Sequence, residues 1–214
     1  YGALNTYKLI RHNSPETDLH FVYGPWTHGG WHESDYEGLG AIEFTKGLSA
    51  DFMTDIEYPF FRYYLEGKGK RPEPVYIAAS GSDKWQTMDV WPNKDLNYIS
   101  LYLNDGKSLS CEEETAENCV SSYASDPSAP VPFMKDASRR DKSYMVADQS
   151  FASERADVIT FTGAPQEQVL KLQGPVKVDL NISISTDDAD VVVKLIDMYP
   201  DGYQMLIRGE VFPV

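Results

Sequence analysis

A short apolar run leads directly into a loop of glycines, tryptophans and a histidine in Leu19-His20-Phe21-Val22-Tyr23-Gly24-Pro25-Trp26-Thr27-His28-Gly29-Gly30-Trp31. The apolar run favours a β-strand, and Gly24-Pro25 predicts where that strand ends. Upstream, Leu4 and Tyr7 recur at helical spacing, and Pro15 predicts that this helix ends near Asn13. A helix, a tight connection and an apolar strand form half of an α/β unit, so the start of the chain is predicted to be α/β structure.

The pattern changes after a second predicted helix, from about Thr54 to Glu66, which Gly67 to Pro72 should end. Residues 105–150 are polar and read mostly as loop, and no helix-length periodic segment follows about residue 70. Short apolar runs separated by turns predict strands at 75–79, 99–103, 158–162, 169–172, 176–184, 191–198 and 205–212. Many short strands with Gly and Pro turns indicate a β-sandwich or jelly roll, so the chain reads as α/β followed by all-β.

His28 is the first candidate for chemistry. A side chain just beyond the carboxyl end of an α/β strand lies where such sheets place their active sites. An imidazole held there can act as a general base near neutral pH, and Trp26 and Trp31 could wall a pocket. The alternative from spacing alone is a histidine that hydrogen-bonds its own turn.

Several motifs in order resemble one enzyme family. They are Gly24-Pro25-Trp26-Thr27-His28-Gly29, Phe60-Phe61-x-x-Tyr64-Leu65-x-Gly67, Gly81-x-x-x-Trp85, Trp91-Pro92, Asp126-Pro127-x-x-Pro130-Val131-Pro132, Asp148-Gln149, Arg155-x-Asp157-Val158 and Lys194-Leu195-x-Asp197-x-Tyr199-Pro200-Asp201-Gly202. Together they resemble the cocaine esterase and α-amino acid ester hydrolase family. That family includes glutaryl-7-aminocephalosporanic acid acylase-type enzymes and is related to X-Pro dipeptidyl peptidases. The resemblance spans nearly the whole chain.

The resemblance implies an α/β-hydrolase domain with an inserted helical cap and a C-terminal jelly roll. Residues 1–94 would be the C-terminal end of the hydrolase domain, and residues 95–214 a jelly roll that is expected to be truncated. Composition alone would place the boundary near Gly67 to Lys70. His28 would be the histidine of a Ser-His-Asp triad that cleaves ester or amide bonds without a cofactor, with Trp26, Trp31 and Tyr36 as substrate-binding candidates. The triad serine and aspartate would lie upstream, because this fold orders them Ser, Asp, His and no Gly-x-Ser-x-Gly occurs in the chain.

The chain is therefore predicted to be a fragment of a serine hydrolase and to be inactive alone. Its partners would be a small ester or amide substrate and the remaining hydrolase and cap domains. The sequence does not distinguish an amino-acid ester, a β-lactam, a glutaryl amide or a simple aromatic ester. The competing hypothesis is a non-catalytic jelly-roll module that binds carbohydrate or docks on another domain. The tyrosines after Trp91 are scattered rather than grouped, which favours a structural role over a sugar platform.

Composition excludes several classes of partner. The 214 residues carry 19 Lys and Arg against 33 Asp and Glu, a net charge of −14, which would repel the phosphates of nucleic acid or of anionic lipid. No run of eighteen apolar residues is present, so no transmembrane helix is predicted.

Cys111 and Cys119 are predicted to close a small disulfide loop, with two free thiols as the alternative. A bridge would indicate an oxidising compartment, and with the family resemblance it predicts export to the periplasm or outside of a bacterial cell.

Metal sites are disfavoured. Gly29 and Gly30 make a shared helix face for His28 and His32 improbable, and Glu33 adds only one further ligand. The cluster Asp187-Asp188-x-Asp190 lacks the spacing of a calcium loop, and we expect it to be a charged turn. Glu112 to Glu114 with Glu117 read as a solvated loop face.

Overall fold

The computed structural model describes residues 2–33, 38–44, 47–82, 84–114, 120–139 and 141–214. It divides into two compact units, Tyr1–Asp95 and Leu96–Val214. The boundary predicted from sequence, between residues 94 and 95, lies one residue before this division. The assignment of the units to a hydrolase domain and a jelly roll stays a prediction.

The first unit is built on a small mixed sheet. Strand β1 (Phe21–Tyr23) pairs in parallel with β4 (Val75–Ala78), and β5 (Trp85–Met88) pairs antiparallel with β4. The order is therefore β1-β4-β5. The parallel pair requires a long crossover between β1 and β4, and the loop of His28 begins this crossover.

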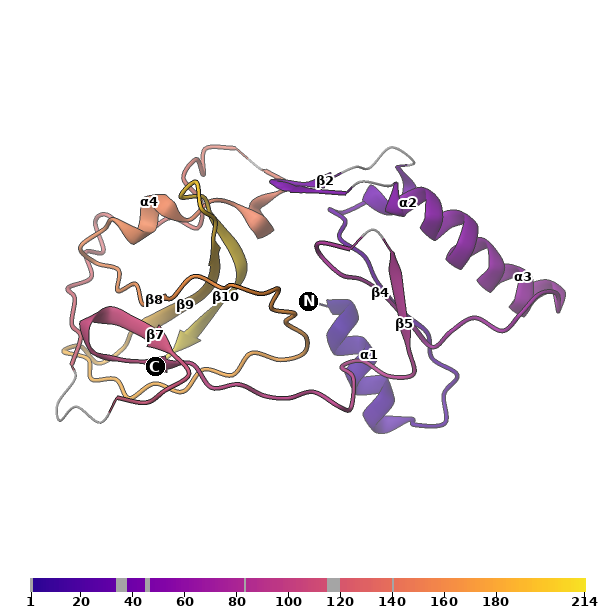
Figure 1. The fold of residues 1–214 in the computed structure, drawn as a ribbon, viewed down its shortest axis with the longest axis horizontal. Coiled ribbons are helices and arrows are strands. Elements are labelled where there is room, and N and C mark those ends of the chain that lie inside the picture. The colour runs from indigo at the N-terminus through magenta and orange to yellow at the C-terminus, as the bar shows by residue number, and fades with distance from the viewer. Residues whose placement is uncertain (1, 34–37, 45–46, 83, 115–119, 140) are drawn as a thin grey trace. The chain divides into compact units, whose positions relative to one another are not determined.

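Helix α1 (Gly2–Asn13) precedes β1, and the predicted helix ending near Asn13 is confirmed. The second predicted helix is also confirmed, but it begins earlier. Helix α2 (Leu48–Asp51), the π-helical segment η2 (Phe52–Glu57) and helix α3 (Tyr58–Glu66) follow one another as one continuous helical rod (Figure 1). Gly67 ends it in the left-handed conformation, with φ of 67°. Between β1 and this rod, strands β2 (Gly38–Leu39) and β3 (Ile42–Glu43) form a minimal hairpin.

A compact apolar cluster joins α1 to the sheet. Its buried members are Tyr7, Phe21, Val75 and Ile77, and the rings of Tyr7 and Phe21 stack with centroids 4.6 Å apart. The Tyr7 hydroxyl accepts a hydrogen bond of 3.1 Å from the backbone N–H of Trp91. This cluster fixes β1, and so fixes the point from which the His28 loop leaves the sheet.

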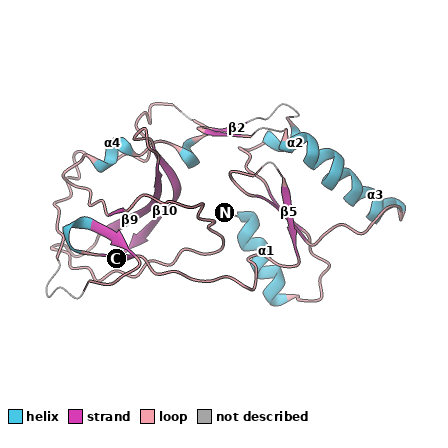
Figure 2. Ribbon diagram, viewed as in Figure 1, coloured by secondary structure: helices cyan, strands magenta, loops and turns pink. Residues whose placement is uncertain are grey.

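The second unit holds one long hairpin and one small sheet. Strands β9 (Asp190–Met198) and β10 (Gln204–Pro213) pair antiparallel, with an irregularity between Leu206 and Arg208. Strands β6 (Tyr102–Leu103), β7 (Ser108–Ser110) and β8 (Thr162–Gly163) form the sheet β6-β7-β8. Helix α4 (Ser150–Ser153) is a single turn. Figure 2 shows that loop dominates the chain between β7 and β9.

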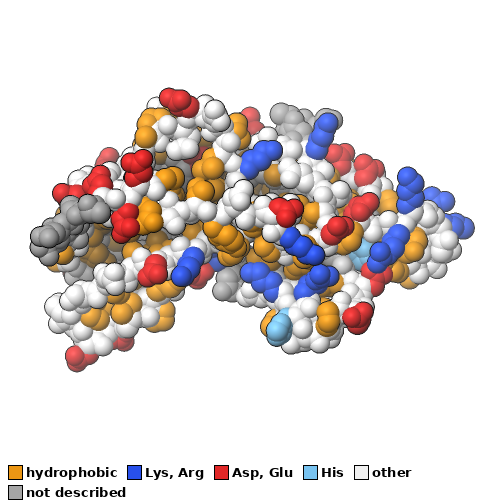
Figure 3. Space-filling model, turned by 60° about the horizontal axis from the view of Figure 1, so that its bottom comes forward, with side chains coloured by type: hydrophobic (Ala, Val, Ile, Leu, Met, Phe, Trp, Pro, Cys, Tyr) orange, Lys and Arg blue, Asp and Glu red, His pale blue; other side chains and the backbone are white. Residues whose placement is uncertain are grey.

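Two predicted strands are not formed, and two others are formed only at their ends: of residues 99–103 only Tyr102–Leu103, and of residues 158–162 only Thr162, belong to strands. Residues 169–172 and 176–184 carry the apolar pattern that is typical of strands, but neither segment forms a strand in the structure. Their apolar side chains remain solvent-exposed, among them Val176, Val178, Leu180, Ile182 and Ile184. A strand needs a neighbouring strand to accept and donate its backbone hydrogen bonds, and these residues have none among the described residues. Hydrophobic side chains accordingly reach the surface at many places in the face drawn in Figure 3.

A buried amide organises the second unit around β9 and β10. Gln149 is fully buried; its Nε2 donates to the carbonyl of Ala147 at 3.1 Å and its Oε1 accepts from Lys194 Nζ at 2.6 Å. Its backbone N–H donates to the carbonyl of Gln204 at 2.8 Å. Gln149 therefore connects the turn before α4 to both strands of the hairpin, which gives a structural reason for the Asp148-Gln149 motif.

The ammonium of Lys194 makes the stability of this unit depend on pH. Burial lowers the pKa of Lys194 below its ordinary value, so between the two values the unfolded chain binds more protons than the folded chain. The unfolding free energy of the wild type, relative to that of Lys194→Met, is therefore expected to increase as the pH rises past the lowered pKa of Lys194. Urea unfolding at pH 7.5 and pH 10 measures this difference. Lys177→Met, which replaces an exposed lysine, serves as the control. If the difference in unfolding free energy between the wild type and Lys194→Met stays flat or falls from pH 7.5 to pH 10, the expectation is contradicted.

Candidate functional site

The loop after β1 holds His28 in a tight turn. The N–H of Gly30 donates to the carbonyl of Thr27 at 3.0 Å, and Gly29 adopts φ of 92°, the left-handed region that glycine tolerates best. A single 3-10 turn, η1 (Gly30–His32), follows. The glycines thus allow the chain to reverse immediately after His28.

Trp26 anchors this loop to the helical rod. Its indole Nε1 donates to Ser49 Oγ at 2.6 Å, and the fully buried Ser49 hydroxyl donates to the carbonyl of Gly30 at 2.9 Å. The Trp26 ring also contacts Phe52 and Trp85, with centroids 5.1 and 5.5 Å away. Both sides of the His28 turn are therefore attached to α2 through one serine.

Gly24 leaves room for that indole. A Cβ at this position would lie 2.1 to 2.5 Å from three ring atoms of Trp26, far inside van der Waals contact. The close approach of backbone and ring explains why glycine precedes Pro25 at the end of β1.

The imidazole of His28 is solvent-exposed, and its ring lies edge-on to Trp31 with centroids 5.8 Å apart. Among the described residues, no carboxylate or hydroxyl is hydrogen-bonded to it. Its ring nitrogens are thus available, but a general base also needs a group that orients it and a nucleophile to deprotonate. The described residues supply a positioned imidazole and no complete triad.

A pocket of about 340 Å³ opens beside the loop. Its walls come from the end of β1, the loop and the helical rod, and include Tyr23, Trp26, Trp31, Phe52 and Glu57. The structure thus brings together two of the three predicted substrate-binding residues. The third, Tyr36, lies outside the described residues.

Sequence reasoning missed Ser49, Phe52 and Glu57. Ser49 lies 23 positions from the indole that it binds, and no local pattern marks such a contact. The Phe52 and Glu57 positions belong to the π-helical segment, whose geometry departs from the α-helical spacing used to read the sequence.

Three further expectations concern the disulfide, metal binding and membrane spans. Cys111 is exposed and Cys119 lies outside the described residues, so their disulfide stays a prediction. Over the described ranges, no three His, Cys, Asp or Glu side chains gather in a way that could hold a metal ion. In the same part of the chain, every helix is too short or too polar to cross a membrane.

Comparison with known proteins gives these features a context. The family model for the X-Pro dipeptidyl-peptidase C-terminal non-catalytic domain matches residues 58–209. The chain belongs to this family. The match begins after the His28 loop, at the first residue of α3, so the family's non-catalytic character describes residues 58–209 and does not extend to His28.

Relatives of this X-Pro dipeptidyl-peptidase C-terminal family member include hydrolases. The cocaine esterase of Rhodococcus sp. (strain MB1 Bresler) is 27% identical over 94% of this chain and 36% of its own length. Because the match leaves so little of the chain uncovered, it includes the His28 loop. The chain thus spans about a third of the length of this curated relative.

Solved structures of two hydrolases have the same fold as this chain over its whole length. An aminopeptidase from a marine sediment Thaumarchaeota archaeon superposes with a TM-score of 0.81 at 25% identity, and an α-amino acid ester hydrolase with a TM-score of 0.83 at 28% identity. Each covers 100% of this chain, and the chain covers 38% of each of them. The resemblance to this group of hydrolases is confirmed, together with a β-rich C-terminal part.

Proposed function

We propose that this chain is the C-terminal part of a serine hydrolase that cleaves ester or amide bonds, and that His28 is its general base. The observation that carries the proposal is the place of His28. It follows a strand of a parallel pair, in an anchored turn, within a segment that matches a cocaine esterase. Carboxyl ends of parallel strands are where α/β enzymes assemble their catalytic groups.

In this mechanism a serine from the rest of the hydrolase attacks the substrate carbonyl while His28 accepts the hydroxyl proton. The imidazolium then gives that proton to the leaving alcohol or amine, and an acyl-enzyme forms. A water, deprotonated by His28, attacks the acyl-enzyme and releases the acid and the serine. An aspartate outside this chain would orient the ring, since no described side chain does so. The Tyr23, Trp26 and Trp31 pocket beside the loop would hold an apolar part of the substrate.

The second unit has a different role in this proposal. We assign residues 95–214 to a jelly-roll domain with a structural rather than catalytic role, consistent with a family described as non-catalytic. Its exposed aromatic residues, such as Tyr98, Tyr123 and Phe133, are dispersed along loops, which disfavours a carbohydrate platform. We further propose that Cys111 and Cys119 form a disulfide bridge, and that the protein is exported to the periplasm or outside of a bacterial cell.

Hydrolysis of a chromogenic short-chain ester tests the proposal. The protein extended upstream through its serine and aspartate is expected to hydrolyse the ester, while residues 1–214 alone give no rate above buffer. The isolated chain lacks an activated nucleophile, which is the reason for the expected loss. Equal activity of the two proteins would refute the triad assignment and would place a complete site within this chain.

A further inference from the structure

The turn that carries His28 has little rigidity of its own. Gly29 and Gly30 follow His28 directly, and Gly29 has φ of 92° with nothing within 4 Å of the place where a Cβ would lie. Glycine restricts the backbone less than any other residue, so this sequence does not by itself hold one conformation. The imidazole of His28 is exposed and contacts the Trp31 ring edge-on. The place of His28 must therefore be set through the chain on either side of it.

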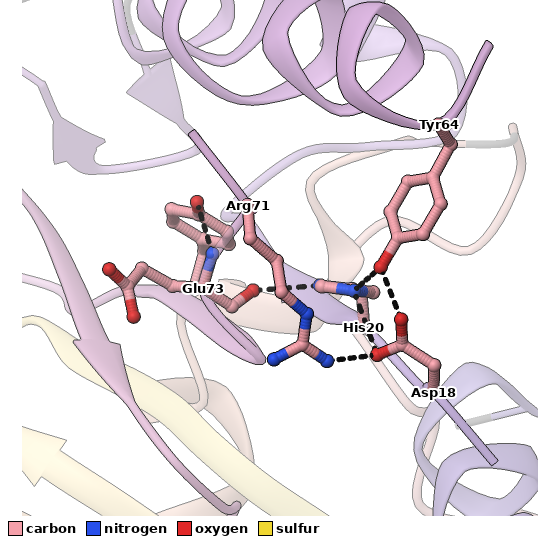
Figure 4. Close-up of polar contacts among 6 residues, drawn as sticks. Asp18, His20, Tyr64, Arg71 and Glu73 are labelled. Atoms are coloured by element: carbon pink, nitrogen blue, oxygen red, sulfur yellow. Dashed lines mark hydrogen bonds and ion pairs between the residues drawn. The ribbon is translucent and has the colours of Figure 1, made fainter. Parts of the chain in front are cut away.

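The connection before β1 is fixed to the helical rod by a polar cluster (Figure 4). The Tyr64 hydroxyl on α3 donates to Asp18 Oδ2 at 2.5 Å and lies 2.8 Å from Nε2 of His20. Arg71 Nη2 donates to Asp18 Oδ1 at 2.5 Å. The other ring nitrogen of His20, Nδ1, lies 2.8 Å from the carbonyl oxygen of Glu73, in the segment that leads into β4. These contacts join the start of β1, the rod and β4 into one frame, from which the His28 loop leaves.

Ser49 connects the loop back to this frame. Its hydroxyl accepts the indole proton of Trp26 at 2.6 Å and donates to the carbonyl of Gly30 at 2.9 Å, and the residue is fully buried. Because an indole can only donate and a carbonyl can only accept, the direction of both bonds is fixed. Trp26 lies two residues before His28, and Gly30 lies two residues after it. One hydroxyl thus holds the chain on both sides of the proposed base.

Ser49 has neither of the usual roles of a serine in a helix. Helix α2 begins after Gly47, and Ser49 is its second residue, so the side chain is not at the capping position. A serine or threonine inside a helix commonly bonds to the carbonyl four residues earlier, as Thr54 does with Ala50 at 3.0 Å. Ser49 donates instead to Gly30, 19 positions away. Its hydroxyl serves the loop rather than the helix.

We propose that Ser49 is a positioning residue, which holds the His28 turn in the place from which the imidazole acts as general base. The inference rests on the proposed function, because it gives Ser49 an effect on catalysis as well as on stability. Ser49 is not among the described residues that line the pocket, and it acts through Trp26 and Gly30. Without the hydroxyl, the indole N–H and the Gly30 carbonyl each lose this partner, and the glycines let the turn shift.

Amide hydrogen exchange in the 214-residue chain tests the hold on the turn without any measurement of activity. The N–H groups of Gly30 and Glu33 close the turn through bonds to carbonyls of the loop. In Ser49→Ala their exchange, relative to that of the Phe21 N–H at the start of β1, is expected to be about tenfold faster, as loss of one hydrogen bond predicts. Thr54→Ala removes a hydroxyl from the same rod and should leave this ratio unchanged. The same ratio in the wild type and in Ser49→Ala would overturn the proposal, whatever the enzyme does.

Ester hydrolysis by the extended protein tests the catalytic consequence. At a temperature where the variant is folded, Ser49→Ala is expected to lower kcat by about 10²-fold, the cost of a shift of about 1 Å. KM should change less than kcat, because Ser49 does not line the pocket. A serine that only stabilises the fold would lower the urea midpoint and leave kcat of the folded protein unchanged, and this result would overturn the proposal.

His28→Ala in the same assay separates the two levels of the account. If His28→Ala abolishes turnover and Ser49→Ala does not lower it, the role of Ser49 is overturned and the proposed function stands. If His28→Ala keeps the wild-type kcat, the proposed function is overturned, and the role of Ser49 with it. If Ser49→Ala does not fold, Ser49→Cys replaces it, since a thiol of similar size is a weaker donor and acceptor. A folded Ser49→Cys protein with wild-type exchange and wild-type kcat would equally overturn the role of Ser49.

Discussion

In the hydrolase extended upstream of residue 1, His28→Ala is expected to lower kcat for a chromogenic short-chain ester by about 10⁴-fold to 10⁶-fold, as loss of a triad member does. Without the imidazole, the serine hydroxyl keeps its proton and is a weak nucleophile. KM should change little, because the Trp26 and Trp31 walls of the pocket remain. Steady-state kinetics at neutral pH measure both quantities.

His32→Ala is the matched control for this substitution. His32 is exposed, lies four residues away and also contacts the Trp31 ring, with centroids 5.4 Å apart. It should retain kcat within a few-fold. If His28→Ala and His32→Ala behave alike, the loop is a structural feature and the binding-module hypothesis gains support.

Gly24→Ala is expected to damage both stability and activity. The new methyl group would overlap the Trp26 ring, which Ser49, Phe52 and Trp85 hold in place. Overpacking of this kind costs about 1–3 kcal/mol of unfolding free energy. Because Trp26 also positions the turn of His28, a shift of about 1 Å should cost about 10²-fold in kcat.

Urea unfolding of the 214-residue chain and ester hydrolysis by the extended protein measure the two effects of Gly24→Ala. Gly2→Ala is the control, since a Cβ at Gly2 meets nothing within 4 Å. Unchanged stability and unchanged kcat in Gly24→Ala would show that Trp26 can move aside freely and does not position His28.

The parts of the fold that local patterns describe were predictable from sequence. The spacing of Leu4 and Tyr7 predicted α1, and the apolar run before Gly24-Pro25 predicted β1. The position of His28 after a strand also followed from the chain. In each case the signal lies within a few neighbouring residues, where periodicity and turn chemistry decide the structure.

Contacts between distant residues were not predictable. The pairings of Trp26 with Ser49 and of His20 with Tyr64 depend on how the helical rod packs beside β1, and the pairing of His20 with Glu73 depends on the segment that leads into β4. No spacing rule connects positions 23 to 53 residues apart. The pocket walls at Phe52 and Glu57 were missed because these residues lie in a π-helical segment, which departs from α-helical spacing.

The β-rich second unit shows the limit of pattern reading for strands. Residues 191–198 and 205–212 are apolar runs that fold within the β9–β10 hairpin, because a turn at Tyr199–Tyr203 brings the two runs together. Residues 176–184 alternate more clearly, with apolar side chains at every second position, yet form no strand. Alternation indicates an amphipathic segment, whereas a strand also requires a partner for its backbone.

The measurement that most directly tests the role of this chain is the site of covalent labelling by a fluorophosphonate in the extended protein, located by mass spectrometry. The account predicts that wild-type protein is labelled at one serine upstream of residue 1, and that His28→Ala reacts far more slowly at that same serine. A label on a serine within residues 1–214, or equally fast labelling of the wild type and His28→Ala, would contradict it.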